Sequence, residues 1–122
     1  MVHIRRDEGR GVAVLEPSRE IDLSLVEAIK HSIASLVQEG YTRLILDCKG
    51  GCRVPHLVLG VLRERIRRLR AVGGSLCLVR TSPTLSHALG AGRLPLELPI
   101  FPDEDSALRS FGPPRAGNPG GL

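Results

Sequence analysis

The chain has 122 residues, 42% of them hydrophobic, and a formal net charge of +4, which are values of a single globular domain. It has three aromatic residues and no tryptophan, so the stacking platforms of base-binding nucleic-acid modules are missing. Three cysteines give no disulfide framework, and no apolar run is long enough for a signal peptide or a membrane span. We therefore expect a cytoplasmic protein that inserts into no membrane.

The pattern of apolar residues predicts nine strands and helices. In chain order, we expect strands at residues 3–5 and 12–15, a helix at 22–39, a strand at 44–48, a helix at 55–71, a strand at 75–79, a helix at 84–89, a strand at 98–101 and a helix at 103–111. The first helix is the clearest because its apolar residues recur at a spacing of three or four. The apolar run at 44–48 is typical of a parallel strand that is covered on both faces. The order ββαβαβαβα predicts an α/β domain with a mixed, mostly parallel sheet of four or five strands packed with helices.

The domain is expected to end near residue 111. Residues 112–122 are rich in proline and glycine and have almost no apolar side chains, a composition that favours disorder. We therefore divide the chain into a domain at residues 1–111 and a disordered tail at residues 112–122.

The loop that follows the strand at 44–48 is the first place to expect a binding site, because α/β sheets bind ligands at the carboxyl ends of their strands. The loop contains Gly50-Gly51 but no lysine followed by serine or threonine, so it is not a phosphate-binding loop. Cys48 and Cys52, even with His56, leave a metal site short of a ligand. No nucleophile, base and orienting group stand out together. We therefore expect no enzyme activity, no cofactor and no metal.

Four segments of the chain carry short patterns of a known family. Arg19-Glu20-Ile21-Asp22-Leu23 is similar to a G-E-(I/L)-D segment before the first helix. The stretch from Leu46-Asp47 to Gly60-Val61-Leu62 is similar to L-D-L-S-x-V-x-x-(I/M)-D-S-S-G-L-G-x-L. The other two are Val72-Gly73-Gly74-Ser75-Leu76-Cys77-Leu78-Val79 with Ser82-Pro83, and the closing Phe101-Pro102-Asp103-Glu104-Asp105-Ser106-Ala107-Leu108. Together with the order of elements, they resemble the STAS domain, the fold of anti-sigma factor antagonists, over residues 2–111. The resemblance implies this fold and a function in protein binding.

The chain departs from the family pattern at the start of the second helix. In family members regulated by phosphorylation, this helix opens with Asp-Ser-Ser-Gly, and the first serine takes phosphate from a partner kinase. Laid over this chain without gaps, those positions are Pro55, His56, Leu57 and Val58. The phosphoacceptor-equivalent position is therefore His56, which has no hydroxyl group, so the usual serine switch is missing. His56 is open to three interpretations: an exposed residue without a special role, a contact in a protein interface, or a phosphohistidine or pH-sensing group.

Arginines crowd the predicted helix at 55–71. Five of them are offset only by Glu64, and they alternate with an apolar stripe that faces the sheet. The basic face that they form comprises Arg63, Arg67, Arg68 and Arg70, with Arg65 beside it. It is either a solvated face or a docking surface for an acidic protein patch or for phosphates. Without aromatic residues or a DNA-reading motif, an acidic protein is favoured over nucleic acid.

The absence of a catalytic constellation favours a non-enzymatic module, and the resemblance implies a bacterial protein for signalling in transcription regulation. It resembles an anti-sigma factor antagonist, and the resemblance implies a protein partner of the serine-kinase class of anti-sigma factors. The expected partner-binding residues are Asp22, Arg53, Pro55, His56, Leu57 and Leu59. Two other hypotheses stay open: an accessory subunit of an ABC-type lipid transporter, and a basic scaffold that binds anionic partners through the arginine-rich helix.

Overall fold

The computed structural model describes residues 2–17, 23–49, 56–81 and 99–111. The elements in these segments are β1 (Val2–Asp7), β2 (Val12–Pro17), α1 (Leu23–Glu39), β3 (Arg43–Asp47), α2 (His56–Ala71), β4 (Ser75–Val79), β5 (Ile100–Phe101) and α4 (Glu104–Ser110). Their order agrees with the prediction. The helix predicted at 84–89 and the tail predicted at 112–122 lie outside the described residues. No helix in the described segments is long and apolar enough to cross a bilayer.

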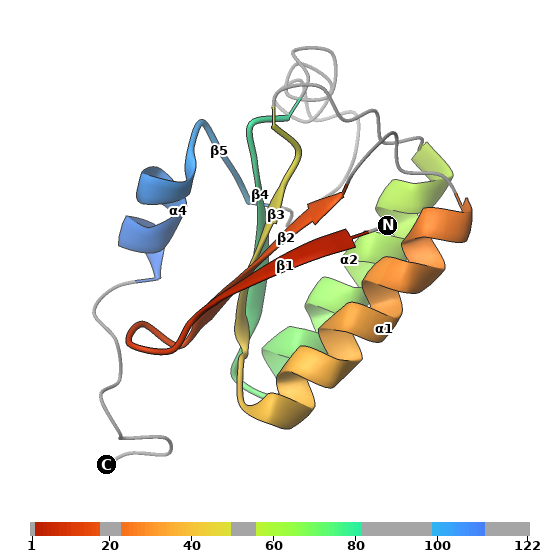
Figure 1. Ribbon diagram of the computed structural model, residues 1–122. Helices are drawn as coiled ribbons and strands as arrows, with labels where there is room; N and C mark the ends of the chain where they lie inside the picture. Colours follow the sequence, from red (N-terminus) through yellow and green to blue (C-terminus); the bar gives the residue numbers. More distant parts are fainter. Residues whose placement is uncertain (1, 18–22, 50–55, 82–98, 112–122) are drawn as a thin grey trace.

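The five strands form one sheet in the order β1-β2-β3-β4-β5. β1 is antiparallel to β2, and all other neighbouring strands are parallel. Helices α1 and α2 lie side by side on one face of the sheet, and α4 lies on the other face (Figure 1). The predicted α/β class and the mixed, mostly parallel sheet are therefore confirmed.

The central strands are buried on both faces. In β3, Leu44 and Leu46 pack toward α1 and α2, whereas Ile45 packs toward α4, because successive side chains of a strand point to opposite faces. This is the two-sided burial that the apolar run at 44–48 predicts. Cys48 and Cys77 are both buried, and burial raises the pKa of the Cys77 thiol to about 12. Cys77 therefore acts as a small apolar core residue rather than as a reactive group.

Several predicted strand boundaries differ in the structure: β1 spans Val2–Asp7 rather than residues 3–5, and β2 ends at Pro17 rather than at residue 15. β3 ends at Asp47 rather than at residue 48, because the Asp47 carboxylate accepts the backbone N–H of Lys49 at 2.9 Å and Lys49 adopts a φ of 53°. β5 begins at Ile100 rather than at residue 98, which lies outside the described residues. Pro99 has no N–H to donate to a ladder, but its carbonyl accepts the N–H of Leu78 at 3.0 Å.

Candidate functional site

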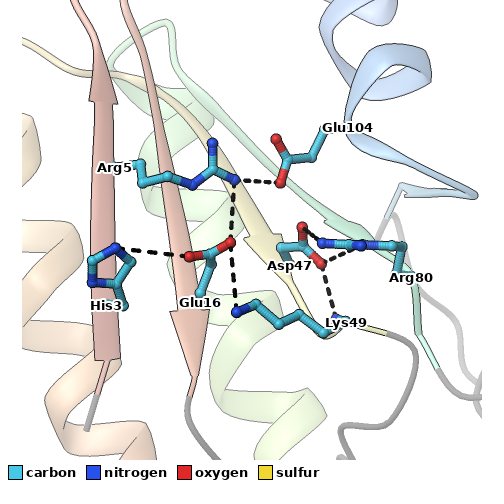
Figure 2. Close-up of polar contacts among 7 residues, drawn as sticks. All are labelled: His3, Arg5, Glu16, Asp47, Lys49, Arg80 and Glu104. Carbon is cyan, nitrogen blue, oxygen red and sulfur yellow. Dashed lines mark hydrogen bonds and ion pairs between the residues drawn. The ribbon is translucent and has the colours of Figure 1, made fainter.

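Ionisable side chains gather where β2, β3 and β4 end, on the face of the sheet that carries α4 (Figure 2). Glu16 continues the alternation of Val12 and Val14 in β2, and Asp47 follows Ile45 by two residues in β3, so both carboxylates point to this face. Glu104 reaches the same place from the first residue of α4. We call Glu16, Asp47 and Glu104 the carboxylate cluster; oxygens from all three lie within 4.8 Å of one another.

Asp47 is the centre of the cluster and is fully buried, with 0% of its surface exposed. The Arg80 guanidinium donates through Nε to Oδ1 at 2.9 Å and through Nη2 to Oδ2 at 2.5 Å. The backbone N–H of Lys49 also donates to Oδ1, at 2.9 Å. Burial alone would raise the pKa of Asp47, but the hydrogen bonds from Arg80, Glu104 and Lys49 outweigh burial and hold the pKa below its usual value.

The outer side of the cluster is held by Arg5 of β1. Its Nη2 donates to Glu104 Oε2 at 2.5 Å and to Glu16 Oε2 at 3.2 Å. The Lys49 ammonium and the His3 ring each lie 4.0 Å from an oxygen of Glu16. The hydrogen bond to Asp47 and burial raise the pKa of Glu104, while Arg5 opposes this shift. A carboxyl group that hydrogen-bonds to a carboxylate must carry the proton of that bond, so Glu104 is the group that gains a proton first.

The arrangement is an ion-pair network rather than a metal centre. Three oxygens within 4.8 Å could bridge a cation, but Arg80 already forms two hydrogen bonds with Asp47, and Arg5 joins Glu16 to Glu104. These arginines supply the positive charge that a metal would otherwise bring. The network connects four strands with α4.

The network also shapes the edge of the sheet from which α2 begins. Lys49 and Arg80 are the two described residues other than glycine with a left-handed backbone, at φ values of 53° and 52°. Each such residue costs about 1–2 kcal/mol. Lys49 is two residues beyond the end of β3, and Arg80 directly follows the end of β4. Asp47 compensates this cost because it accepts the Lys49 N–H and the Arg80 side chain. The network thus sets the direction in which the chain leaves β3 toward α2.

The two shifted carboxyl groups predict a stability that depends on pH in opposite ways. Folding raises the pKa of Glu104, so its contribution is present below the pKa of the unfolded chain and is lost as pH rises through the folded value. Folding lowers the pKa of Asp47, so its contribution is present above the unfolded pKa and is lost as pH falls through the folded value. We expect Glu104→Gln to flatten the loss on the alkaline side and Asp47→Asn to flatten the loss on the acid side. Urea unfolding midpoints between pH 3 and pH 8 measure both changes. A Glu104→Gln midpoint curve parallel to the wild-type curve would contradict the raised pKa of Glu104.

The residues predicted to bind a partner fall partly in the described segments. Asp22, Arg53 and Pro55 lie outside the described residues. His56 is the first residue of α2, and Leu57 and Leu59 follow it in the opening turn. The helix therefore begins at the phosphoacceptor-equivalent position. Arg63, Arg67, Arg68 and Arg70 are exposed along the rest of α2.

Sequence reasoning missed most of the network. It named Asp47 only as part of the family pattern at Leu46-Asp47 and did not place Glu16, Arg80 or Glu104 beside it. The signal was present in part: Glu16 and Asp47 each continue the two-residue period of an apolar strand on the same face. A charged residue in that position must meet a partner of opposite charge, because an unpaired buried charge is costly.

Comparisons with known proteins agree with this fold. A family model described as the STAS domain matches residues 3–107. The anti-sigma factor antagonist SpoIIAA in its unphosphorylated form matches with a TM-score of 0.68 and 22% identity, over 92% of this chain and 99% of that chain. TM1081 from Thermotoga maritima, described as a candidate anti-sigma factor antagonist, matches with a TM-score of 0.74 and 17% identity, over 89% and 92% of the two chains. An anti-sigma factor antagonist from Mycobacterium paratuberculosis gives a TM-score of 0.62 and 19% identity, over 90% and 92%. No curated protein matches the chain closely enough to count as a relative.

Proposed function

Because the chain belongs to the STAS domain family, we propose that it is a non-enzymatic module that regulates a protein partner by binding it, in the manner of an anti-sigma factor antagonist. The observation that carries the proposal is the similarity in fold to SpoIIAA, which extends over 92% of this chain and 99% of that chain. SpoIIAA has been solved in phosphorylated and unphosphorylated forms. The proposed partner is an anti-sigma factor of the serine-kinase class.

The proposed docking site is the start of α2. The helix begins at His56, and the positive end of its dipole lies at this end, where it favours a polar or negatively charged group of a partner. Asp47 and Lys49 fix the strand end from which the chain leads to this helix. We assign the contact to Arg53, Pro55, His56, Leu57 and Leu59, with Asp22 at the rim.

The proposed regulation differs from a phosphorylation switch. His56 occupies the position at which regulated family members carry the serine that accepts phosphate. Without a hydroxyl group there, a partner kinase has no serine to modify, and ATP should not release the partner. The module would then hold its partner for as long as both are present, and its abundance would set the level of regulation.

We expect His56→Glu to reduce partner retention at least tenfold, because a glutamate places charge and bulk at the centre of the proposed contact. The tagged protein is used to capture partners from lysate of the source organism at physiological salt after nuclease treatment, and mass spectrometry identifies them. His31→Glu is the matched control, because it makes the same change at an exposed position of α1. Wild type and the control should retain a serine-kinase-class anti-sigma factor before and after incubation with ATP.

Three results would contradict the proposal. The first is equal loss of the partner in both variants, and the second is release by ATP. The third is stoichiometric phosphate on another hydroxyl residue such as Ser24 or Thr81. Retention of an ABC-type transporter ATPase instead of an anti-sigma factor would favour the alternative function as a transporter subunit.

A further inference from the structure

The whole net charge of the protein is carried by one helix. The chain has 17 basic and 13 acidic residues, giving a net charge of +4. Helix α2 contains five arginines and Glu64 as its single acidic residue, so its own net charge is also +4. All other residues together are electrically neutral. A charge distribution this uneven produces a local positive potential that attracts a negative partner to one side of the molecule.

The arginines are ordered along the helix. Leu62, Ile66 and Leu69 are buried against the sheet, and Arg63, Arg67 and Arg70 lie next to this buried side on one flank, at spacings of four and three residues. We call these three residues the arginine row; all three are exposed. Arg70 is seven positions after Arg63, so the row is about 10 Å long.

The fold does not require the arginine row. Basic residues in the last turn, here Arg68 and Arg70, complement the negative end of the helix dipole. Arg63 lies in the middle of the helix, where this effect has faded. Arg63 and Arg67 are four residues apart, and like charges at this spacing destabilise a helix by a few tenths of a kcal/mol, roughly 0.2–0.5. For Arg67, the ion pair with Glu64 is weak compensation, since its Nη1 lies 3.9 Å from a Glu64 oxygen and both side chains are exposed.

We propose that the arginine row is a docking surface for an acidic protein segment whose carboxylates recur at helical spacing. Guanidinium groups bind carboxylates through two parallel hydrogen bonds, and carboxylates three or four residues apart on a partner helix match the spacing of the row. Residues 57–74 contain no aromatic side chain, so the surface along the arginine row lacks the stacking groups of single-strand nucleic-acid binders. Val72 is exposed at 62% just beyond the helix end, which provides an apolar contact that a protein can use and a phosphate backbone cannot.

This surface is separate from the proposed docking site at His56. Arg63 is seven positions after His56, or about 10 Å farther along the helix. A partner could contact both, but either site can be tested without the other. Loss of binding at the arginine row leaves the function proposed for the start of α2 unaffected, and the reverse also holds.

The test uses three fluorescent probes of defined chemistry. The first is a helical peptide with glutamates at positions i, i+4 and i+7, the second is a 20-base-pair DNA duplex, and the third is a vesicle of phosphatidylglycerol and phosphatidylcholine. Binding to the full chain is measured by anisotropy, or by co-sedimentation for the vesicle. We expect the peptide to bind most tightly. We expect Arg63→Glu with Arg67→Glu to weaken peptide binding at least tenfold, and the affinity to fall as salt rises.

A charge-matched control distinguishes the effect of the arginine row on peptide affinity from the effect of the net charge of the protein. Arg10→Glu with Arg109→Glu changes the charge of the protein by the same amount, at two exposed positions away from α2, and should change peptide affinity less than twofold. Arg63→Lys with Arg67→Lys keeps the charge and folds as the wild type does, but should bind at least threefold more weakly if paired guanidinium contacts matter. Tighter binding to the duplex or the vesicle overturns the proposal. So do equal losses in both glutamate pairs and absence of binding to the peptide at low salt.

Discussion

Replacing Arg80 with alanine is expected to lower the free energy of unfolding by about 3 kcal/mol. Removal of one partner from a buried ion pair costs about 3–5 kcal/mol, because the other charge stays buried without compensation. Asp47 is 0% exposed, whereas the Arg80 side chain is 45% exposed, so solvent already screens one member of the pair. The lower end of the range is therefore appropriate. Urea denaturation at pH 7 gives the value.

Arg10 provides the comparison for Arg80. Its side chain is 56% exposed and its Nε lies 3.6 Å from a carboxylate oxygen of Asp7, which is also exposed. Arg10→Ala should cost less than about 1 kcal/mol, as is usual for surface pairs. Replacing both members of the buried pair, Asp47→Asn with Arg80→Met, should recover most of the stability lost in Arg80→Ala, because no charge is left buried. Equal losses for Arg80→Ala and Arg10→Ala would show that Asp47 does not depend on its partner.

Arg80→Ala should also reverse the effect of acid on Asp47. In the wild-type protein, hydrogen bonds keep the pKa of Asp47 below its usual value, so acid removes its stabilising contribution. Without the guanidinium, burial becomes the dominant influence on this pKa and raises it. As pH falls, the difference in free energy of unfolding between the wild type and Arg80→Ala should therefore decrease.

The second large effect is expected at Gly74, where α2 turns into β4. A Cβ atom on this residue would lie 2.5 Å from the carbonyl oxygen of Thr42 and 2.9 Å from its Cβ. The oxygen is held in place because it accepts the N–H of Ser75 at 2.8 Å. Gly74→Ala should therefore force the start of β4 away from β3 and cost about 3 kcal/mol, at the upper end of the usual range for overpacking.

The neighbouring Gly73 makes a sharp control. It has a φ of +82°, but no atom lies within 4 Å of the position that a Cβ would occupy. Gly73→Ala should cost about 1–2 kcal/mol, the usual penalty for a left-handed residue. Thermal or urea unfolding of both variants ranks them directly. If Gly73→Ala proves the more damaging, backbone conformation rather than the close contact with Thr42 limits this turn.

The main features of the fold could be predicted because they depend on local patterns. The apolar run at 44–48 predicted burial on both faces. In the structure, α1 covers part of one face and α4 covers the other, as the alternation of strands and helices implied. The glycine that ends α1 adopts a φ of +103°, as a left-handed helix end requires. Boundaries were less accurate where a side chain intervened, as at Asp47, whose carboxylate takes up the N–H of Lys49.

The ion-pair network could not be predicted because it depends on strand register. Glu16 looked like the end of a strand, and Glu104 looked like an acidic residue in the first turn of a helix, a common position for one. Only the pairing of β2 with β3 and the position of α4 bring them to Asp47. The arginine row, in contrast, could be predicted from spacing alone, because helical periodicity decides which residues share a flank.

The bond between Arg5 and Glu104 joins residues that are 99 positions apart. During synthesis, β1 and β2 are made before the rest of the domain. Arg5 can pair with Glu104 only after almost the whole domain has been made. The apolar contacts of α1 and α2 can form earlier, because they need only the first two thirds of the chain. Assembly therefore has an inherent order: the face of the sheet covered by α1 and α2 can close while the chain is still growing, and the face covered by α4 closes only when the final helix has been made.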